Sequence, residues 1–400
     1  MNPFDKELNQ RLEDLREQGL RRELRRLDSA QGPRVKIGGQ TYLNFSSNDY
    51  LGLANHPALK EAAVKAVGKF GAGGGASRLI CGSLAPFHEL EETLATFKGT
   101  EAALTFSTGY AAALGTITAI VGKDDIIIID KLVHACIVDA AKLSGAKLRI
   151  FDHNDLNDVE EILRWSSSFR LSGNTLKREL QPRVLIITES IFSMDGDAAP
   201  LREIVALKEK YDTWLMVDEA HATGLYGKNG RGLAEELGVS DQIEIQMGTL
   251  GKALGASGGY ICGSRVLIDF LVNRARSFIF STAPVPAAAA AATAAIQLVQ
   301  SKTGKLLKER LWTRVTEFQS AIGNRQSAIP SAIIPIIIGD ETKTVEVASN
   351  LREQNIFIPA IRYPTVARGA ARLRVTLTAA HTSEDVAELV AALKTLGLGL

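Results

Sequence analysis

Cysteine is scarce in this chain, and its scarcity argues against two kinds of protein. The 400 residues contain only Cys81, Cys136 and Cys262, which lie far apart in the sequence. Small secreted domains depend on many disulfides, and structural zinc sites need closely spaced cysteines and histidines. The sequence therefore predicts neither a disulfide framework nor a metal site, and the isolated thiols fit a reducing compartment.

A dominant charge sign and a long membrane-spanning run are also missing. The formal net charge is +1, so there is no excess of positive charge for binding nucleic acid or an anionic membrane. The longest apolar tract, PVPAAAAAATAAIQLV, is mostly alanine, which is a poor membrane anchor. The start, MNPFDKELNQRLEDLREQ, lacks the apolar core of a signal peptide. We therefore expect a cytoplasmic protein that binds neither nucleic acid nor membrane.

Short apolar strands alternate with helical patterns along most of the chain. The strand candidates are rich in valine and isoleucine and include DDIIIID, KLRIFD, RVLIITES, TWLMVDEAH, IEIQMGTL and GGYICGS. Uninterrupted apolar strands of this kind are buried on both faces, and intervening helices indicate a largely parallel sheet. The sequence therefore predicts a large α/β domain over residues 48–285.

The two ends of the chain show different patterns. Leucines at roughly helical spacing predict a charged amphipathic helix over residues 5–27, within an N-terminal segment 1–47. The arginines of its RRELRR stretch are interpreted as a solvated face. After an alanine-rich helix near 285–300, residues 286–400 alternate helices with strands at AIIPIIIGD, IFIPAIRY and ARLRVTLT. This region is expected to form a smaller α+β domain.

A glycine-rich stretch and a polar stretch need separate interpretation. GAGGGA, residues 71–76, satisfies the dinucleotide-binding pattern G-x-G-x-x-G/A, but the helical pattern HPALKEAAVKAVGKFG precedes it where a strand is required. We interpret it as a loop after a helix, with glycines for positive φ, and expect no nicotinamide chemistry. The stretch SSSFRLSGNTLKRELQPR is predicted to be a polar loop.

Polar side chains follow several buried strands at their carboxyl ends. Asp218 and His221 follow one strand, Ser193 a second and His134 a third, while Lys252 lies in the small-residue turn GTLGKALG after a fourth. Open α/β sheets bind ligands at this edge. Each residue alone has a simpler interpretation as a turn cap or a loop residue. Capping explains less easily why polar groups from four strands converge.

The segment FSTGYAAALGTITAIV adds a candidate phosphate site. A strand-like run gives way here to a helix that begins near Gly109 and Tyr110. A helix N-terminus offers free N–H groups and the positive end of a dipole to an anion. An ordinary N-cap at Ser107 or Thr108 explains the same residues about equally well.

Together these groups match the needs of one cofactor. Pyridoxal 5′-phosphate requires a lysine for covalent attachment, an acid beside its ring nitrogen, a donor to its ring oxygen, a stacking partner and a phosphate cradle. Groups able to fill all five roles occur here, namely Lys252, Asp218, His221, His134 and the helix start at Gly109. The sequence therefore predicts pyridoxal 5′-phosphate as the cofactor.

Six motifs resemble those of the α-oxoamine synthases, which are fold-type I pyridoxal-phosphate enzymes. They are NFSSNDYLGL, FHELEETLATFKGTEAALTFSTGY, FSMDGDAAPL, VDEAHATGLYGKNGRG, TLGKALGASGG and RLRVTLTAAH, and the resemblance runs from about residue 5 to the end. It implies a large domain with a mostly parallel sheet, a smaller C-terminal α+β domain and an N-terminal helical segment. It also implies a homodimer with shared active sites.

The resemblance implies a role for each candidate residue. Lys252 holds the cofactor and later acts as the base at the substrate α-carbon, and Asp218 pairs with the ring nitrogen. His134 stacks over the ring, whereas His221 and Ser193 form hydrogen bonds near the ring oxygen. The remaining implied contacts are to the phosphate, from Gly109, Tyr110, Thr249 and, across the dimer, Thr282, and to substrates, from Arg22, Asn48, His134, Thr365 and Arg374.

The implied reaction joins an amino acid to an acyl thioester with loss of carbon dioxide. The acyl donor is an acyl-CoA or an acyl carrier protein. Within the family, NFSSNDYLGL and IRYPTV resemble most the members that use L-alanine with a pimeloyl donor in biotin biosynthesis. The alternative is glycine with acetyl-CoA, or the substrates of another α-oxoamine synthase. A non-catalytic scaffold with this fold would be marked by loss of Lys252 or Asp218, and both are present.

Overall fold

The computed structural model describes residues 1–172, 182–323 and 329–397, and the chain forms two compact units. The central unit comprises Leu51–Ser193 and Asp197–Lys308, and the terminal unit comprises Met1–Tyr50, Met194–Gly196 and Glu309–Leu400. The structure thus places both ends of the chain in one unit. The three predicted domains remain predictions.

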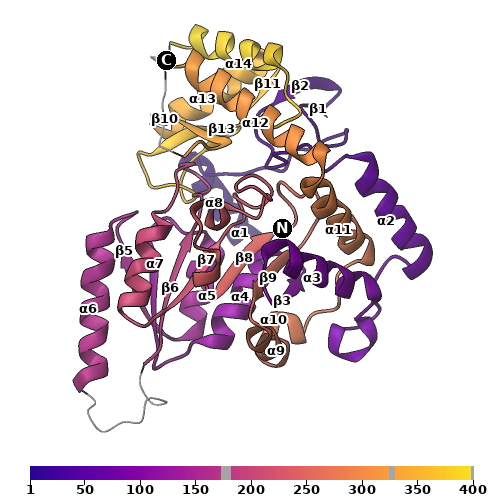
Figure 1. The fold of residues 1–400 in the computed structure, drawn as a ribbon. Coiled ribbons are helices and arrows are strands. Elements are labelled where there is room, and N and C mark those ends of the chain that lie inside the picture. Colours follow the sequence, from indigo (N-terminus) through magenta and orange to yellow (C-terminus); the bar gives the residue numbers. More distant parts are fainter. Residues whose placement is uncertain (173–181, 324–328, 398–400) are drawn as a thin grey trace. The chain divides into compact units, whose positions relative to one another are not determined.

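A seven-stranded sheet forms the core of the central unit (Figure 1), with strand order β3-β9-β8-β7-β6-β4-β5. Its strands are β3 (Ala102–Phe106), β4 (Ile126–Asp130), β5 (Lys147–Phe151), β6 (Val184–Glu189), β7 (Trp214–Asp218), β8 (Ile245–Thr249) and β9 (Gly259–Gly263). Strands β4 to β8 pair in parallel, whereas β9 runs antiparallel to both β8 and β3. The prediction of a largely parallel sheet is confirmed.

Apolar side chains fill both faces of the inner strands. Every residue of β4 and β6 is buried, as expected for strands covered on both sides. The register places Glu189 opposite Asp218, and Asp218 opposite Met247. The carboxyl ends of β6 and β7 are therefore level, and β8 continues two residues further to Thr249, so the residues that follow all three strands start from one edge of the sheet.

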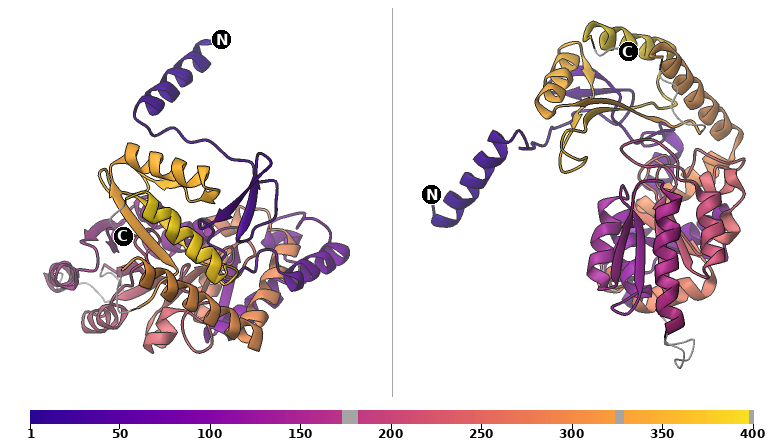
Figure 2. Two further views of the ribbon diagram at one scale, coloured as in Figure 1. Left: turned by 90° about the horizontal axis from the view of Figure 1, so that it is seen from above. Right: turned by 90° about the vertical axis from the view of Figure 1, so that its left-hand side faces the viewer.

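Helices cover both faces of this sheet, as the two views of Figure 2 show. They are α2 (Pro57–Phe70), α3 (Ala85–Lys98), α4 (Gly109–Ile120), α5 (Ala135–Ser144), α6 (Leu156–Ser172), α7 (Leu201–Lys210), α8 (Leu233–Leu237), α9 (Arg265–Arg274), α10 (Arg276–Ile279) and α11 (Pro286–Gln300), with the short turns η1 (Arg78–Gly82) and η3 (Ser240–Gln242). The predicted alanine-rich helix is α11, and its small side chains allow it to pack against α2 and α3.

The glycine-rich stretch 71–76 is a loop that follows α2, as predicted. Gly71 ends the helix with a φ of 79°, and Gly75 has a φ of 75°. Both angles lie in the region that glycine adopts without steric cost. The loop leads to the single turn η1, so its context differs from the strand-to-helix junction of a dinucleotide site.

The polar stretch 166–183 is partly helical, so the prediction of a loop throughout is wrong. Helix α6 continues to Ser172. Ser166 tolerates the helix because its hydroxyl donates a hydrogen bond to the carbonyl of Ile162 at 2.8 Å. The middle of the stretch, residues 173–181, lies outside the described residues.

The terminal unit contains two three-stranded sheets, with orders β1-β2-β11 and β10-β13-β12. The strands are β1 (Arg34–Ile37), β2 (Gln40–Asn44), β10 (Ile333–Gly339), β11 (Ile356–Phe357), β12 (Ala360–Ile361) and β13 (Ala371–Thr376). The helices are α1 (Pro3–Glu17), α13 (Glu341–Glu353) and α14 (Ser383–Thr395), and α12 (Lys302–Ala321) spans the boundary between the units along the chain. The α+β character predicted for the C-terminal region is confirmed.

The N-terminal helix is shorter than the prediction of residues 5–27. It ends at Glu17, and Gly19 follows with a φ of 66°, a left-handed conformation typical of helix ends. Every residue of α1 is exposed, and Figure 2 shows the helix projecting from the rest of its unit. The arginines after Gly19 therefore do not form one face of a helix.

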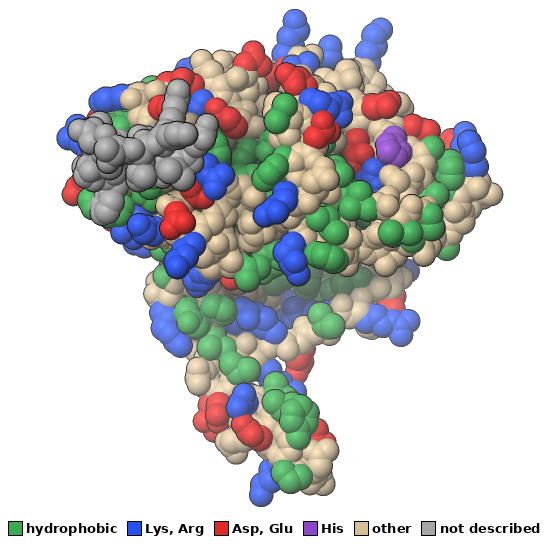
Figure 3. Space-filling view, turned by 90° about the horizontal axis from the view of Figure 1, so that it is seen from below, with side chains coloured by type: hydrophobic (Ala, Val, Ile, Leu, Met, Phe, Trp, Pro, Cys, Tyr) green, Lys and Arg blue, Asp and Glu red, His purple; other side chains and the backbone are tan. Residues whose placement is uncertain are grey.

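Charged side chains of both signs are mixed with apolar ones on the surface. Figure 3 shows this mixture on the face seen from below, and it agrees with the formal net charge of +1. Among the described residues, none of the helices has the length and apolar character that crossing a membrane requires.

Candidate functional site

The central unit brings the predicted amine, acid and imidazole to the carboxyl edge of its sheet. Asp218 is the last residue of β7, and His221 follows it in the next turn. Lys252 lies in the turn after β8. Its Nζ is 2.6 Å from Nε2 of His221, which is hydrogen-bonding distance. Two turns from neighbouring strands thus place a primary amine and an imidazole in contact.

Asp218 is suited to hold a positive charge. Its side chain is buried, and this burial raises the pKa of the carboxyl, while the charge of Lys252 acts in the opposite direction. Oδ1 accepts a hydrogen bond from the backbone N–H of Ala220 at 2.9 Å. A buried carboxylate gains most from a cation placed against it. The protonated ring nitrogen of pyridoxal phosphate is such a cation, so this residue fits the cofactor.

Glu189 lies beside Asp218 on the neighbouring strand. Burial and the charge of Asp218 raise the pKa of the Glu189 carboxyl to about 8. This carboxyl accepts a hydrogen bond from the backbone N–H of His134. Glu189 therefore helps to fix the start of α5, where His134 stands, and its position at the end of a buried strand was the sequence signal for it.

His134 is the N-cap of α5. Its Nδ1 accepts a hydrogen bond from the backbone N–H of Cys136 at 3.2 Å. The surrounding protein and the charge of Lys252 lower the pKa of the imidazole, although the side chain keeps an exposed face. The ring is therefore neutral at neutral pH. A neutral ring with an accessible face fits the predicted stacking role.

The start of α4 and Thr249 form a cradle suited to a phosphate group. Thr108 caps the helix by accepting a hydrogen bond from the N–H of Ala111 at 3.0 Å. A Cβ atom at Gly259 would lie 2.6 Å from the N and Cα atoms of Gly109, so glycine is needed there for the helix start to approach the sheet. A Cβ at Gly109 would lie 3.9 Å from the Cβ of Thr249. The free N–H groups of the helix start and the Thr249 side chain are thus neighbours.

Three other predicted cofactor residues lie in the same unit. Tyr110 is 44% exposed, and its hydroxyl donates to Asp139 at 2.5 Å. Ser193 is half-buried and lies between β6 and α7. Thr282 is exposed and forms an isolated bridge with Ser77. Their contacts with phosphate or ring oxygen remain predictions.

A network centred on His153 supports this edge of the sheet, and no pattern in the sequence pointed to it. His153 Nδ1 lies 3.0 Å from Oδ1 of Asp130, and Nε2 lies 2.7 Å from Oδ2 of Asp197. Burial disfavours the charged ring, but the two carboxylates outweigh it and raise the pKa of His153 to about 10. The ring of Phe192 packs edge-on at 4.4 Å between centroids. The network therefore steadies the segment that carries Ser193.

Replacing His153 by asparagine is expected to destabilise the protein by about 3 kcal/mol near pH 6, because two carboxylates lose their cation. The folded pKa of about 10 exceeds the ordinary value of 6.5, so this stabilisation is complete below pH 6.5 and is lost as the pH rises through about 10. Denaturant unfolding of both proteins across this range tests the expectation, with the exposed His88→Asn as the control. A stability difference independent of pH would contradict it.

Two predicted substrate residues are linked within the terminal unit. Arg374 on β13 is buried, and its guanidinium donates to Thr376 Oγ1 at 2.9 Å and to the hydroxyl of Tyr50 at 3.4 Å. The Tyr50 hydroxyl in turn donates to Oδ1 of Asn48 at 3.3 Å. Sequence reasoning missed Tyr50, although it stands in the NFSSNDYLGL motif beside Asn48. An arginine held in this way is able to bind a carboxylate.

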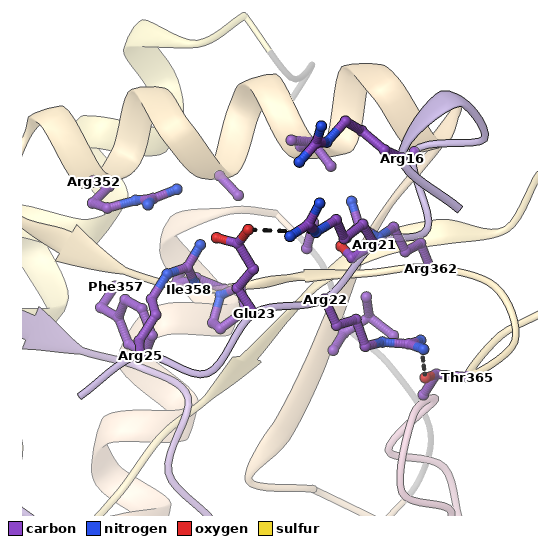
Figure 4. Close-up of a pocket in the computed structure, with 16 residues that line it drawn as sticks. Arg16, Arg21, Arg22, Glu23, Arg25, Arg352, Phe357, Ile358, Arg362 and Thr365 are labelled. Atoms are coloured by element: carbon purple, nitrogen blue, oxygen red, sulfur yellow. Dashed lines mark hydrogen bonds and ion pairs between the residues drawn. The ribbon is translucent and has the colours of Figure 1, made fainter. Parts of the chain in front are cut away.

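Arg22 and Thr365 also lie together in the terminal unit. Nη2 of Arg22 is 3.5 Å from the hydroxyl of Thr365 and 3.4 Å from the carbonyl of Tyr363. Arg21 instead forms ion pairs with Glu13 and Glu23. The structure therefore distinguishes the two adjacent arginines, and Figure 4 shows Arg22 and Thr365 joined at one side of a pocket.

Comparison with known proteins places this geometry in a wider context. Residues 40–393 match the family model described as aminotransferase class I and II. The chain is 46% identical over 389 residues to a protein of Geobacter sulfurreducens named 8-amino-7-oxononanoate synthase, with 96% of each chain covered. It is 43% identical over 393 residues to a protein of Thermoanaerobacter pseudethanolicus with the same name, with 98% and 96% covered.

Solved structures of related proteins share the fold. A serine palmitoyltransferase from S. paucimobilis, solved with bound PLP–myriocin, superposes with a TM-score of 0.88 at 28% identity, covering 99% of this chain and 98% of that one. An 8-amino-7-oxononanoate synthase from Francisella tularensis superposes with a TM-score of 0.73 at 28% identity, covering 89% and 96%.

Proposed function

The chain belongs to the aminotransferase class I and II family, and from this premise we propose that it condenses L-alanine with a pimeloyl thioester to give 8-amino-7-oxononanoate. The reaction releases carbon dioxide and the thiol carrier and belongs to biotin biosynthesis. The observation that carries the proposal is Lys252, held against His221 on the turn next to buried Asp218. The choice of substrates is supported by relatives at 43–46% identity that are named for this product.

The cofactor of the enzyme is pyridoxal 5′-phosphate, as in a structural relative solved with it. When bound, it supplies an electron sink for negative charge at the α-carbon of the amino acid. Asp218 holds the positive charge at the ring nitrogen by charge pairing. The start of α4 and Thr249 hold the phosphate through backbone N–H groups and a hydroxyl. His134 would stack on the ring, and Ser193 and His221 would donate hydrogen bonds near the ring oxygen.

Lys252 is the proposed base that moves a proton to and from the α-carbon of the amino acid. Its amine would hold the cofactor covalently before L-alanine binds, and the same amine would remove and later return a proton at the α-carbon. Nε2 of His221 lies 2.6 Å from Nζ, so the imidazole orients the amine for proton transfer at the α-carbon. The glycines of GTLGKALG leave room for the ring and the substrate beside the amine.

The terminal unit supplies the proposed substrate contacts. The guanidinium of Arg374 binds the carboxylate of L-alanine. Asn48 is linked to this arginine, because the Tyr50 hydroxyl forms hydrogen bonds with both side chains. Arg22 and Thr365 contact the acyl donor. The working assembly is a homodimer in the cytoplasm, in which Thr282 of one subunit contributes to the phosphate site of the other.

Substrate comparison tests the proposed function. The purified enzyme is supplied with L-alanine and pimeloyl-CoA, with L-alanine and a pimeloyl carrier protein, or with glycine and acetyl-CoA, and carbon dioxide release is measured. We expect kcat/KM with L-alanine and a pimeloyl donor to exceed that with glycine and acetyl-CoA by at least about a hundredfold. Turnover of glycine and acetyl-CoA without turnover of L-alanine would replace the proposed reaction by the alternative.

A further inference from the structure

A buried ion pair lies one residue away from the proposed cofactor acid in the central unit. It joins Lys98, the last residue of α3, to Glu219, which directly follows Asp218 at the end of β7. Both side chains are 1% exposed. Lysine and glutamate are almost never fully buried unless their charges are paired, and the proposed function uses neither residue. The pair therefore needs an explanation of its own.

The pair ties three segments of the chain together. Nζ of Lys98 donates hydrogen bonds to Oε2 of Glu219 and to the carbonyl of Arg231, the latter at 2.5 Å. Oε1 of Glu219 accepts a hydrogen bond from the backbone N–H of Ala234 at 2.9 Å. One ammonium group and one carboxylate thus join the end of α3, the end of β7 and the segment that leads into α8.

The backbone beside the pair leaves room for the carboxylate. A Cβ atom at Gly232 would lie 2.4 Å from both carboxylate oxygens of Glu219. The same glycine has a φ of 138°, which residues with a side chain rarely adopt. Glycine at this position therefore allows the loop to pass close enough for the N–H of Ala234 to reach the carboxylate.

Stability alone does not account for an ion pair buried this deeply. Moving two charges out of water costs free energy, and apolar side chains of similar size often stabilise a protein as well as the pair does. What the charged groups add is a set of directional hydrogen bonds, which select one arrangement of the segments that they join. The arrangement fixed here includes the turn that follows β7.

Glu219 is held on both sides within the turn that carries two proposed cofactor residues. Asp218 precedes it, and His221 lies two residues after it. Its N–H donates to the carbonyl of Met247 on β8 at 2.8 Å, and its carbonyl accepts from the N–H of Ala222 at 2.9 Å. The backbone of Glu219 thus closes the turn while its side chain is anchored by the ion pair, so a rotation of this residue would move both neighbours.

We propose that Lys98 and Glu219 are positioning residues, whose ion pair fixes the turn after β7 so that Asp218 and His221 face the cofactor. The inference rests on the proposed function, which assigns those two residues to the ring nitrogen and the ring oxygen. Lys98 and Glu219 act on the reaction only through this turn. Loss of the pair should therefore change the orientation of the bound ring more than it changes the stability of the fold.

A double variant, Lys98→Met with Glu219→Gln, separates positioning from stability. Each single replacement leaves one buried charge without its partner and is expected to lower the midpoint of denaturant unfolding. The double variant replaces both charges by side chains of similar size, so its midpoint should return toward that of the wild type. In the holoenzyme without substrate, we expect faster hydrogen–deuterium exchange in peptides that cover residues 218–223, whereas peptides that cover β4 should exchange as in the wild type.

The holoenzyme provides two further measurements. Visible circular dichroism of the bound cofactor reports the orientation of its ring, and this signal should be weaker in the double variant. Its kcat should fall at least about tenfold while the KM for pimeloyl-CoA stays constant. The matched control is Glu61→Gln with Lys65→Met, because these residues form an exposed ion pair at 2.8 Å within α2. The control should equal the wild type in every measurement.

The outcomes separate the positioning role from the proposed reaction. Wild-type exchange, dichroism and kcat in the double variant would overturn the positioning role, whatever its unfolding midpoint. Faster exchange and weaker dichroism, in an enzyme whose wild type turns over no pimeloyl donor, would support the role while refuting the proposed reaction. If the double variant does not fold, Glu219→Gln alone is measured, because it keeps a side-chain oxygen for the N–H of Ala234. Wild-type values in that variant would equally overturn the role of the ion pair.

Discussion

Replacing Lys252 by alanine is expected to lower kcat by at least about 10⁴-fold, because one side chain both holds the cofactor and moves the proton at the α-carbon. Its Nζ lies 2.6 Å from Nε2 of His221, and the imidazole does not replace an amine that forms a covalent bond to the cofactor. The visible absorbance that covalent attachment gives the holoenzyme should disappear. Turnover of L-alanine with pimeloyl-CoA and the absorbance spectrum measure the two effects.

A second lysine provides the control for this variant. Lys123 is exposed and lies just before β4, at the opposite edge of the sheet. Lys123→Ala should keep the activity and the absorbance of the wild type. If Lys252→Ala kept the absorbance band, the cofactor would be attached to another residue, and our assignment of Lys252 would be wrong.

Asparagine at position 218 is expected to lower kcat by about 10³-fold, since it keeps the size of the side chain but removes its negative charge. Burial raises the pKa of the Asp218 carboxyl in the free protein, so this carboxylate depends on a cation beside it. Asparagine does not hold a proton on the ring nitrogen, and the electron sink weakens. Single-turnover kinetics with L-alanine report the proton-transfer step itself.

The matched control for this variant is Asp124→Asn. Asp124 is exposed in the turn that leads into β4, and its replacement should leave turnover unchanged. A proton-transfer rate in Asp218→Asn within about threefold of the wild type would show that the charge of Asp218 is not needed, and would remove the physical reason for its role.

The central sheet was predictable because its strands carry an uninterrupted apolar signal. IIIID in β4 and VLIITE in β6 are buried throughout, and such runs occur where helices cover both faces of a sheet. The edge at which Asp218 and Lys252 lie was predictable for the same reason, because parallel strands end together. The helix over 5–27 was predicted too long, since leucine spacing continues past Gly19 while the backbone turns there.

The less predictable features join residues that are distant in the sequence. The His153 network depends on Asp130 and Asp197, and the contact of Arg374 with Tyr50 joins opposite ends of the chain. The arginines of RRELRR were expected to face solvent, and Arg22, Arg25 and Arg26 are exposed. Nothing in their own segment shows, however, that Arg352 and Arg362 line the same pocket as Arg22 and Arg25. Local spacing identifies what a segment forms by itself, whereas these sites arise from tertiary packing.

Chemical trapping of the cofactor tests the central claim most directly. Borohydride fixes the covalent bond between pyridoxal phosphate and the amine that holds it, and peptide mapping by mass spectrometry then identifies the modified residue. We predict that the reduced cofactor is found on the peptide GTLGKALGASGG, at Lys252. Modification of any other lysine, or no modification of the purified holoenzyme, would contradict the account of this site.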